Sequence, residues 1–251
     1  MKIISVLNHK GGVGKTTSTS NIAGALKMLG KKVLVIDVDP QANLTMSLGL
    51  REKYDKNIYG ALSKKYDLPI LTNVDGIDVV PSTLDLVGAE IELLQAHGRE
   101  FRLRRLLEPI KNKYDFILID CPPNLGVLTS NALTASDGII VPVEAAYFAM
   151  EGLAKLLEVI DLVKDSTNPD LQLYAILVTK YDTRTYLDKN IADNVSKNFA
   201  DKIIKTYIRK NIAIGEAQVI GRDILSYKKR SIGAIDYLAA TKDLLKMLKK
   251  Y

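Results

Sequence analysis

Residues 3 to 17 of the chain read IISVLNHKGGVGKTT. The first part is apolar and rich in β-branched residues, which predicts a buried strand over Ile3–Leu7. A glycine-rich turn follows and leads into a helical pattern over Thr16–Leu29. The turn satisfies the phosphate-loop pattern G-x-x-x-x-G-K-[ST] with one substitution, because His9 stands at the first position. A strand, a phosphate loop and a helix in this order predict a nucleotide-binding site.

The residue types in this loop suit ATP and Mg²⁺. Backbone N–H groups in a glycine-rich turn, together with the positive end of a helix dipole, bind phosphate oxygens. We expect Lys15 to bridge the β- and γ-phosphates and the Thr16 hydroxyl to ligate magnesium. The rest of the loop is expected to line the nucleotide: Gly11, Gly12, Val13, Gly14 and Thr17. The alternative is a plain glycine turn capped by threonines, which the flanking strand and helix disfavour.

Two further strand candidates end in aspartates. Phe116–Asp120 is an apolar strand that would deliver Asp120 to a magnesium shell, the Walker B arrangement, although an aspartate at a strand end can also cap a helix. The other strand candidate, Val33–Asp37, runs into the sequence DVDPQAN. Two carboxylates near a γ-phosphate are costly unless they serve metal or water. One of Asp37 and Asp39 could therefore orient the attacking water while the other joins the magnesium shell.

Strand and helix patterns alternate along the rest of the chain. The other strand candidates are Ile77–Val80, Gly138–Val141, Leu173–Val178 and Ile203–Ile208. The other helix candidates are Leu84–Gln95, Phe101–Lys111, Met150–Lys164, Leu187–Phe199 and Ser231–Lys249. This alternation predicts an α/β fold with a doubly wound, mostly parallel sheet flanked by helices, the P-loop NTPase fold. Because no flexible linker interrupts the pattern, we expect a single domain over residues 1–251, with its ligand at the carboxyl ends of the strands.

The charge of the chain is unevenly distributed. The whole sequence has 35 basic and 29 acidic residues, but the segment from Lys180 onward has 16 basic and 8 acidic residues. A basic segment is often only a solvated surface, and it can also be the footprint of a polyanion such as nucleic acid. We see neither a signal peptide nor an apolar run long enough to cross a membrane. We therefore expect a cytoplasmic protein.

Taken together, these motifs resemble a known family. The segment KGGVGKTT at residues 10–17 resembles the deviant Walker A box of the ParA/MinD/NifH ATPases. DVDPQAN at residues 37–43 looks like the A′ box of ParA-type partition ATPases, and DCPP at residues 120–123 looks like their Walker B and switch II. The likeness continues through LVTKYDTRT at residues 177–185 and covers essentially the whole chain. It is similar in particular to the short, Soj-like ParA proteins.

The resemblance implies a mechanism and a set of residues. It implies an ATP-dependent homodimer in which Lys10 reaches the partner's nucleotide, so that Lys10, Lys15 and Asp39 act in catalysis. It implies a magnesium site of Thr16, Asp39 and Asp120, and contacts near adenine from Thr179, Lys180 and Asn211. It implies non-specific DNA binding through Arg184, Arg209 and Lys210, a nucleoid location, and a ParB-like protein that stimulates slow hydrolysis. The chain departs from the family at Arg209 and Gln218, where relatives usually carry proline.

Three other functions use a similar phosphate loop. A nitrogenase-reductase-like protein needs two cysteines per subunit for a bridging iron–sulfur cluster, and Cys121 is the only cysteine. A MinD-like membrane-surface ATPase would use the basic, amphipathic C-terminal tail. The other interpretation of that tail is that Leu244, Leu245 and Leu248 pack onto the sheet. A metabolic kinase would need an acceptor pocket, to which nothing in the sequence points.

Overall fold

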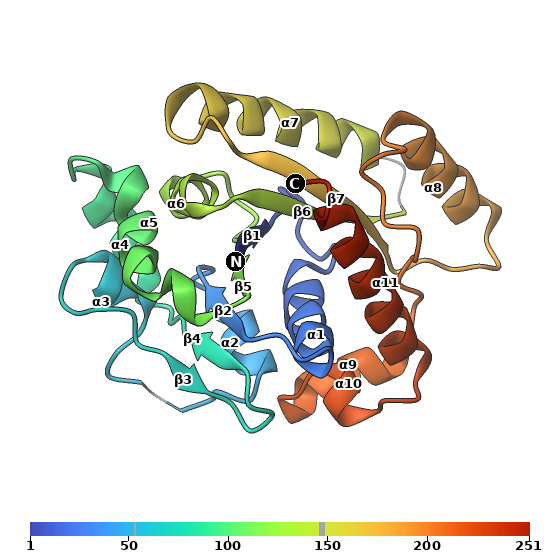
Figure 1. Ribbon diagram of the computed structural model, residues 1–251, viewed down its shortest axis with the longest axis horizontal. Helices are drawn as coiled ribbons and strands as arrows, with labels where there is room; N and C mark the ends of the chain where they lie inside the picture. Colours follow the sequence, from blue (N-terminus) through green and yellow to red (C-terminus); the bar gives the residue numbers. More distant parts are fainter. Residues whose placement is uncertain (53, 146–148) are drawn as a thin grey trace.

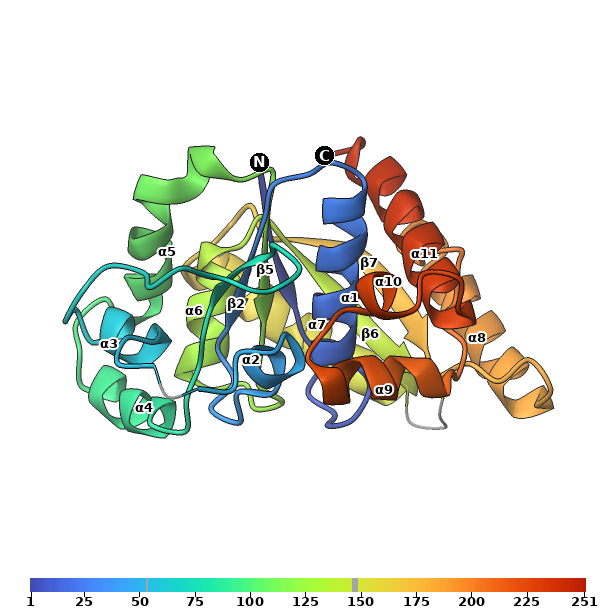
Figure 2. The same ribbon diagram turned by 90° about the horizontal axis from the view of Figure 1, so that it is seen from below.

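The computed structural model describes residues 1–52, 54–145 and 149–251. A seven-stranded sheet runs through it in the order β3-β4-β2-β5-β1-β6-β7, parallel except for the β3–β4 pair (Figures 1 and 2). The strands are β1 (Lys2–Val6), β2 (Val33–Asp37), β3 (Leu71–Thr72), β4 (Asp78–Val80), β5 (Phe116–Asp120), β6 (Gly138–Glu144) and β7 (Gln172–Thr179). The predicted doubly wound, mostly parallel sheet is confirmed.

Helices cover both faces of this sheet (Figure 1). Buried side chains of one face pack against α3 (Ile58–Leu62), α4 (Leu86–Leu94), α5 (Arg102–Leu107), α6 (Val127–Ala135) and α7 (Ala149–Ser166). Those of the other face pack against α1 (Lys15–Met28), α2 (Asn43–Ser47), α9 (Ile212–Ile220), α10 (Ile224–Tyr227) and α11 (Ile232–Leu248). The central strands are apolar on both faces because both faces are buried. Helix α8 (Tyr186–Asn198) lies beyond β7.

The strand predicted over Ile203–Ile208 is wrong. The segment follows the edge of β7 and forms isolated bridges rather than a ladder, Ile176 with Ile203 and, one residue past its end, Tyr181 with Arg209. The amide of Ile208 also donates to the carbonyl of Val178 at 2.8 Å. Between these bridges Thr206 donates its hydroxyl to Asp243 and Tyr207 shares a hydrogen bond with Ser196. These contacts hold the middle of the segment away from a regular ladder.

Other differences from the predicted elements are local. The helix expected over Phe101–Lys111 is instead α5 between two 3-10 segments, Arg99–Phe101 and Glu108–Lys113. Pro109 explains its end, because proline has no backbone N–H to donate to the carbonyl four residues earlier. The short elements α2, α3, α10 and β3, and the nine-residue helices α6 and α9, were not predicted.

The strand order brings the predicted site residues to one edge of the sheet. Strand β1 lies between β5 and β6, and β5 lies between β1 and β2. The loops after β1, β2 and β5 therefore meet at the carboxyl edge, where ligands bind in open α/β sheets. Both chain termini lie at the opposite, amino edge (Figure 2).

Candidate nucleotide site

The loop between β1 and α1 is open and lies at the positive end of a helix. Gly12 and Gly14 have φ values of 75° and 90°, in the left-handed region that glycine adopts without steric cost. A Cβ atom placed on Gly11 or Gly12 would meet no atom within 4 Å, so the backbone of the loop faces free space. Gly14 is the N-cap of α1, and the positive end of that helix points into the same space. The loop can therefore accept phosphate groups along its backbone.

Lys15 lies at the centre of this loop. Its side chain is mostly buried, and its Nζ donates a hydrogen bond to the carbonyl of Lys10 at 3.2 Å. Burial lowers the pKa of Lys15, and the nearby carboxylates of Asp120 and Asp39 act in the opposite direction. A phosphate group bound here would favour the charged ammonium in the same way.

Thr16 and Asp120 form the candidate magnesium site. The Thr16 hydroxyl donates to Asp120 Oδ2 at 2.7 Å, and the Thr19 hydroxyl donates to Oδ1 at 3.1 Å. Burial raises the pKa of Asp120 to about 8, and the neighbouring carboxylate of Asp37 contributes in the same direction. A divalent cation beside Asp120 would stabilise the carboxylate and reverse this shift. Mg²⁺ commonly takes only one or two protein carboxylates together with phosphate oxygens, which these residues fit.

The two aspartates after β2 have different surroundings. Asp37 is fully buried and accepts hydrogen bonds from the amide and hydroxyl of Thr45 and from the amide of Asp39. Burial raises the pKa of Asp37 to about 6. Asp39 accepts the amide of Gln41 at 2.9 Å and lines the cavity above the loop. Of the two carboxylates, Asp39 is therefore the one that faces the cavity.

Two adjoining cavities receive the predicted nucleotide-binding residues. The larger, of about 940 Å³, lies over the phosphate loop, and its lining includes Lys15, Thr16 and Asp39. The second, of about 530 Å³, shares Gly14, Thr17 and Lys180 with the first and is also lined by Thr179 and Asn211. The structure thus brings the phosphate-loop residues and the predicted adenine residues together in one continuous region.

The sequence did not predict two residues that line this region. Gln218 on α9 donates from Nε2 to the Thr17 hydroxyl at 3.0 Å and borders both cavities. Arg51 lines the larger cavity and donates to the backbone carbonyls of Gln218 and Val219. The only signal in the sequence was that glutamine stands at position 218, where the family pattern has proline. Arg51 carries no motif.

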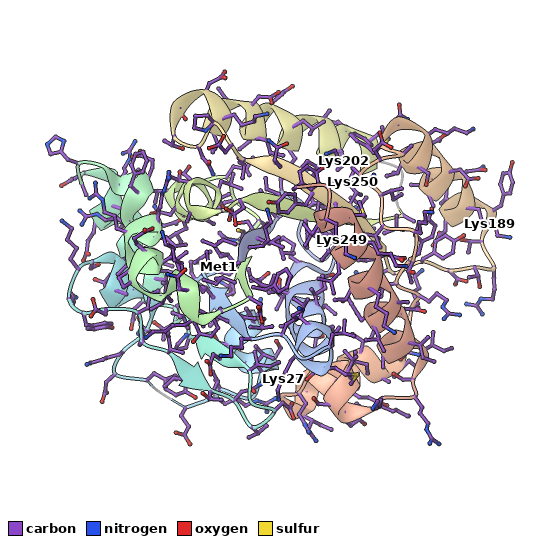
Figure 3. The ribbon with its side chains drawn as sticks, in the orientation of Figure 1. Met1, Lys27, Lys189, Lys202, Lys249 and Lys250 are labelled. Carbon is purple, nitrogen blue, oxygen red and sulfur yellow. The ribbon has the colours of Figure 1, made fainter. Side chains whose placement is uncertain are left out.

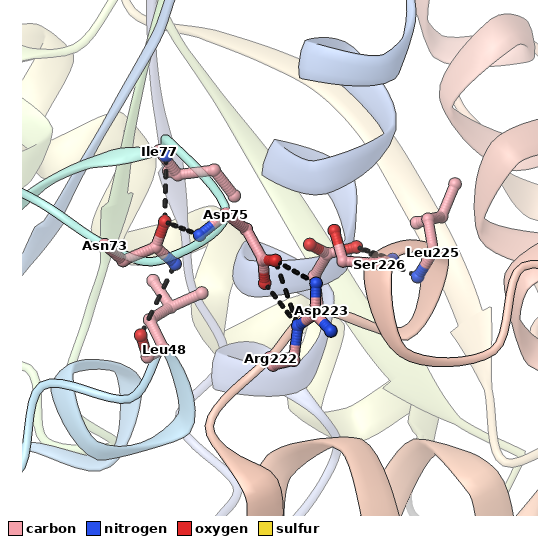
Figure 4. Close-up of polar contacts among 8 residues, drawn as sticks. All are labelled: Leu48, Asn73, Asp75, Ile77, Arg222, Asp223, Leu225 and Ser226. Carbon is pink, nitrogen blue, oxygen red and sulfur yellow. Dashed lines mark hydrogen bonds and ion pairs between the residues drawn. The ribbon is translucent and has the colours of Figure 1, made fainter.

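Helix α9 is held over the cavity by contacts at its C-terminal end (Figure 4). Gly221, with φ of 81°, packs so closely on Gly49 that an added Cβ would lie 2.5 Å from the Gly49 Cα. Arg222 then forms an ion pair with Asp75, whose side chain is buried. Asp223 caps α10 through the amides of Leu225 and Ser226. These contacts join α9 to the end of α2 and to the turn before β4, so the roof of the cavity is fixed from two sides.

The three predicted DNA-binding residues differ in their surroundings. Arg184 is exposed and pairs with Asp182 at 2.8 Å, which holds the pKa of Asp182 well below its usual range. Lys210 is also exposed and contributes to that shift, so its charge lies near the same carboxylate. Arg209 instead pairs with the buried Asp236 at 2.6 Å. The structure thus groups Arg184 and Lys210, and it directs the Arg209 guanidinium toward α11.

Comparison with known proteins places this site in a family. A family model described as an AAA domain matches residues 1–173. The Soj sporulation initiation inhibitor of Bacillus subtilis is 46% identical over 97% of this chain and 98% of its own length. The chromosome partitioning protein ParA of Myxococcus xanthus is 40% identical over 98% of this chain and 88% of its own length.

A solved structure gives the same fold with a nucleotide. It is a Mycobacterium smegmatis protein described as a cobyrinic acid a,c-diamide synthase with bound ADP and magnesium. It superposes with a TM-score of 0.87 at 34% identity and covers 99% of this chain and 96% of that one. The synthase name belongs to that protein, while relatives of higher identity carry the names Soj and ParA. On its motifs, its fold and these full-length matches, the chain belongs to the Soj/ParA family of P-loop ATPases.

Proposed function

We propose that residues 1–251 form a single ATPase domain that switches between a monomer and an ATP-bound homodimer, and that the dimer binds DNA without sequence preference in chromosome or plasmid partition. The observation that carries the proposal is the convergence of Lys15, Thr16, Asp39 and Asp120 beside one cavity. The relatives named for chromosome partitioning support the biological role. A ParB-like partner would stimulate hydrolysis and so release the dimer.

We assign a separate role in ATP binding or hydrolysis to each of these residues. The loop backbone and Lys15 would hold the phosphates of ATP, and Thr16 with Asp120 would hold Mg²⁺. When bound, the cation would neutralise charge on the phosphate oxygens. Asp39 would orient the attacking water, and Thr179, Lys180 and Asn211 would contact the base. Turnover is expected to be slow in the monomer, because Lys10 of the partner subunit is absent there.

The MinD-like alternative finds less support in the C-terminal helix. Leu244 and Leu248 of α11 are buried against the sheet, and Leu245 packs partly against the same core. A helix that adsorbs to a membrane needs an apolar face free to enter the interface. None of the helices in the described ranges is long and apolar enough to span a bilayer.

The first test of the proposed function measures DNA binding in three nucleotide states. Binding to a random-sequence duplex should be strengthened by ATP and not by ADP, because only the ATP-bound dimer brings two basic surfaces onto one duplex. Arg184→Glu and Lys210→Glu should each weaken this ATP-dependent component while leaving dimerisation intact. Fluorescence anisotropy across a salt series measures the affinity for DNA in each nucleotide state. An affinity that ATP leaves unchanged would argue against the switch.

A second test concerns Lys10, which lies at the exposed lip of the loop. Its amide is held by the Asn8 side chain at 3.0 Å and its carbonyl by Lys15, so its backbone is fixed while its side chain points outward. Lys10→Ala should bind ATP normally and fail to dimerise. Light scattering in an Asp39→Ala background would reveal this, because slow hydrolysis there lets dimers accumulate. A double variant that dimerises as fully as Asp39→Ala alone would refute the role in trans.

A further inference from the structure

A second basic surface lies at the amino edge of the sheet, opposite the nucleotide site. In Figure 3, Met1, Lys202, Lys249 and Lys250 lie around the chain termini, and Lys27 lies in the last turn of α1. We define this amino-edge face by eight lysines: Lys2, Lys27, Lys31, Lys32, Lys113, Lys202, Lys249 and Lys250. Within the described ranges, none of the eight forms an ion pair with a side-chain carboxylate, although Lys2 contacts the C-terminal carboxylate of Tyr251. Their charges therefore remain available to an external partner.

Hydrogen bonds and a cation–π contact join the two halves of this face. The amide of Lys32 donates to the Asp115 carboxylate at 2.8 Å, and the amide of Lys2 donates to the Asp115 carbonyl at 2.9 Å. The Lys2 ammonium then donates to the C-terminal carboxylate of Tyr251 at 3.3 Å. The Lys202 ammonium lies 4.8 Å from the centre of the Tyr251 ring. The lysines thus belong to one continuous surface around Asp115 and Tyr251.

Two acidic groups on this face are engaged by neutral donors. A cavity of about 360 Å³ is lined by Lys27, Lys31, Lys32 and Lys113, with Asp78 as its one acidic residue in the described part of the chain. Asp78 accepts the hydroxyls of Thr72 at 2.6 Å and Tyr114 at 2.8 Å. Asp137 accepts the amide of Ile3 at 2.7 Å. Asp115, Glu108 and Asp170 also lie on this face. The eight lysines outnumber these five carboxylates, which reduce the local charge.

We propose that the amino-edge face binds the phosphate backbone of duplex DNA whether or not nucleotide is bound. Lysine ammonium groups on flexible stems make contacts to phosphates that do not depend on sequence, and each contact releases counterions. Strands of five residues span roughly 16 Å, and they separate this face from the phosphate loop. Occupancy of the nucleotide cavity therefore leaves the amino-edge face unchanged.

Duplex DNA suits this surface better than an anionic membrane. The large apolar side chains exposed around the two termini are Met1, Met28 and Tyr251. The Tyr251 ring is engaged by Tyr174 at 4.8 Å and by Lys202. Adsorption to a bilayer needs an apolar face that enters the interface, and the leucines of α11 that could supply one are buried. What remains is charge, which is sufficient for contacts to a phosphate backbone.

The position of the face has a consequence for the proposed dimer. This step rests on the proposed function, because it assumes a dimer joined across the nucleotide sites. Each subunit would then carry its amino-edge face on the outside, directed away from its partner. One dimer could hold two duplex segments at once, in addition to the ATP-dependent contacts near Arg184.

The test is DNA binding without nucleotide. Anisotropy with a random-sequence duplex at about 50 mM salt should detect binding, and affinity should fall steeply as salt rises. Lys249→Glu with Lys250→Glu should weaken binding about tenfold or more, and it should reduce the slope of log affinity against log salt by about 1.8, because two phosphate contacts are lost. Lys31→Glu with Lys32→Glu should do the same from the other end of the face.

The matched control is Lys189→Glu with Lys197→Glu, which makes the same charge change on α8. It should leave binding without nucleotide nearly unchanged. An equal loss in the control would show a general charge effect and overturn the proposal, as would no binding without nucleotide at low salt. Tighter binding to phosphatidylserine vesicles than to the duplex would overturn the assignment to DNA.

The same variants distinguish this proposal from the proposed function. The Lys249/Lys250 variant should retain the additional binding that ATP produces, and Arg184→Glu should retain the binding seen without nucleotide. Unchanged ATP affinity would show that each variant is folded. ATP-dependent binding and binding without nucleotide can therefore be lost separately. Loss of the first tests the proposed function, and loss of the second tests the amino-edge face.

Discussion

Lys15→Ala is expected to lower the affinity for Mg-ATP by at least about 100-fold. Hydrogen bonds to charged groups contribute roughly 1.5–3 kcal/mol each, and the Lys15 ammonium is placed to make more than one to the phosphates. Every 1.4 kcal/mol corresponds to about a tenfold change in the dissociation constant. Titration with a fluorescent ATP analogue would measure the change.

The control for this prediction is Lys155→Ala, which removes an exposed lysine from the surface of α7. It should bind ATP with unchanged affinity. Because Lys15 is mostly buried and bonded to the Lys10 carbonyl, the circular dichroism spectrum of Lys15→Ala should also be recorded. A folded Lys15→Ala variant with nearly normal ATP affinity would contradict the assigned role.

Asp39→Ala is expected to block hydrolysis while ATP binding persists. A positioned carboxylate that orients or deprotonates water typically contributes about 10²–10⁴-fold in rate, so turnover should fall at least about 100-fold. The variant should then accumulate as an ATP-bound dimer. Phosphate release under single-turnover conditions gives the rate, and light scattering gives the dimer.

Asp39→Asn provides the isosteric comparison, since it keeps the shape and removes the charge. It should hydrolyse ATP as slowly as Asp39→Ala. If both variants turn over at the parent rate, Asp37 becomes the next candidate. That would require Asp37 to exchange its hydrogen bonds with Thr45 for contacts in the cavity.

The elements closest to the phosphate loop were predicted well because their signals are local. The strands Val33–Asp37 and Phe116–Asp120 have the predicted bounds, since continuous apolar runs between polar ends leave few alternatives. The Gly-Lys-Thr motif likewise predicts a phosphate loop between a strand and a helix. Asp39 and Asp120 could be assigned to the same edge because strand ends meet there in a parallel sheet.

The residues that were missed depend on contacts between distant segments. Gln218 reaches Thr17 only because Gly221 packs on Gly49 and Arg222 pairs with Asp75. Nothing in the local sequence of α9 reports these partners. The amino-edge face was missed for the same reason, because it combines lysines from widely separated parts of the chain. A count of charge along the sequence pointed to the C-terminal third alone.

The central position of β1 also constrains how the chain can fold during synthesis. Its neighbours are β5 and β6, which begin at Phe116 and Gly138. On a ribosome that adds about 5–20 residues per second, β1 therefore waits several seconds for either partner. Pairings between such distant segments are intrinsically slow to form. During that interval an apolar strand and the phosphate loop attached to it are exposed, which makes the nascent chain a natural client for chaperones that shield hydrophobic segments.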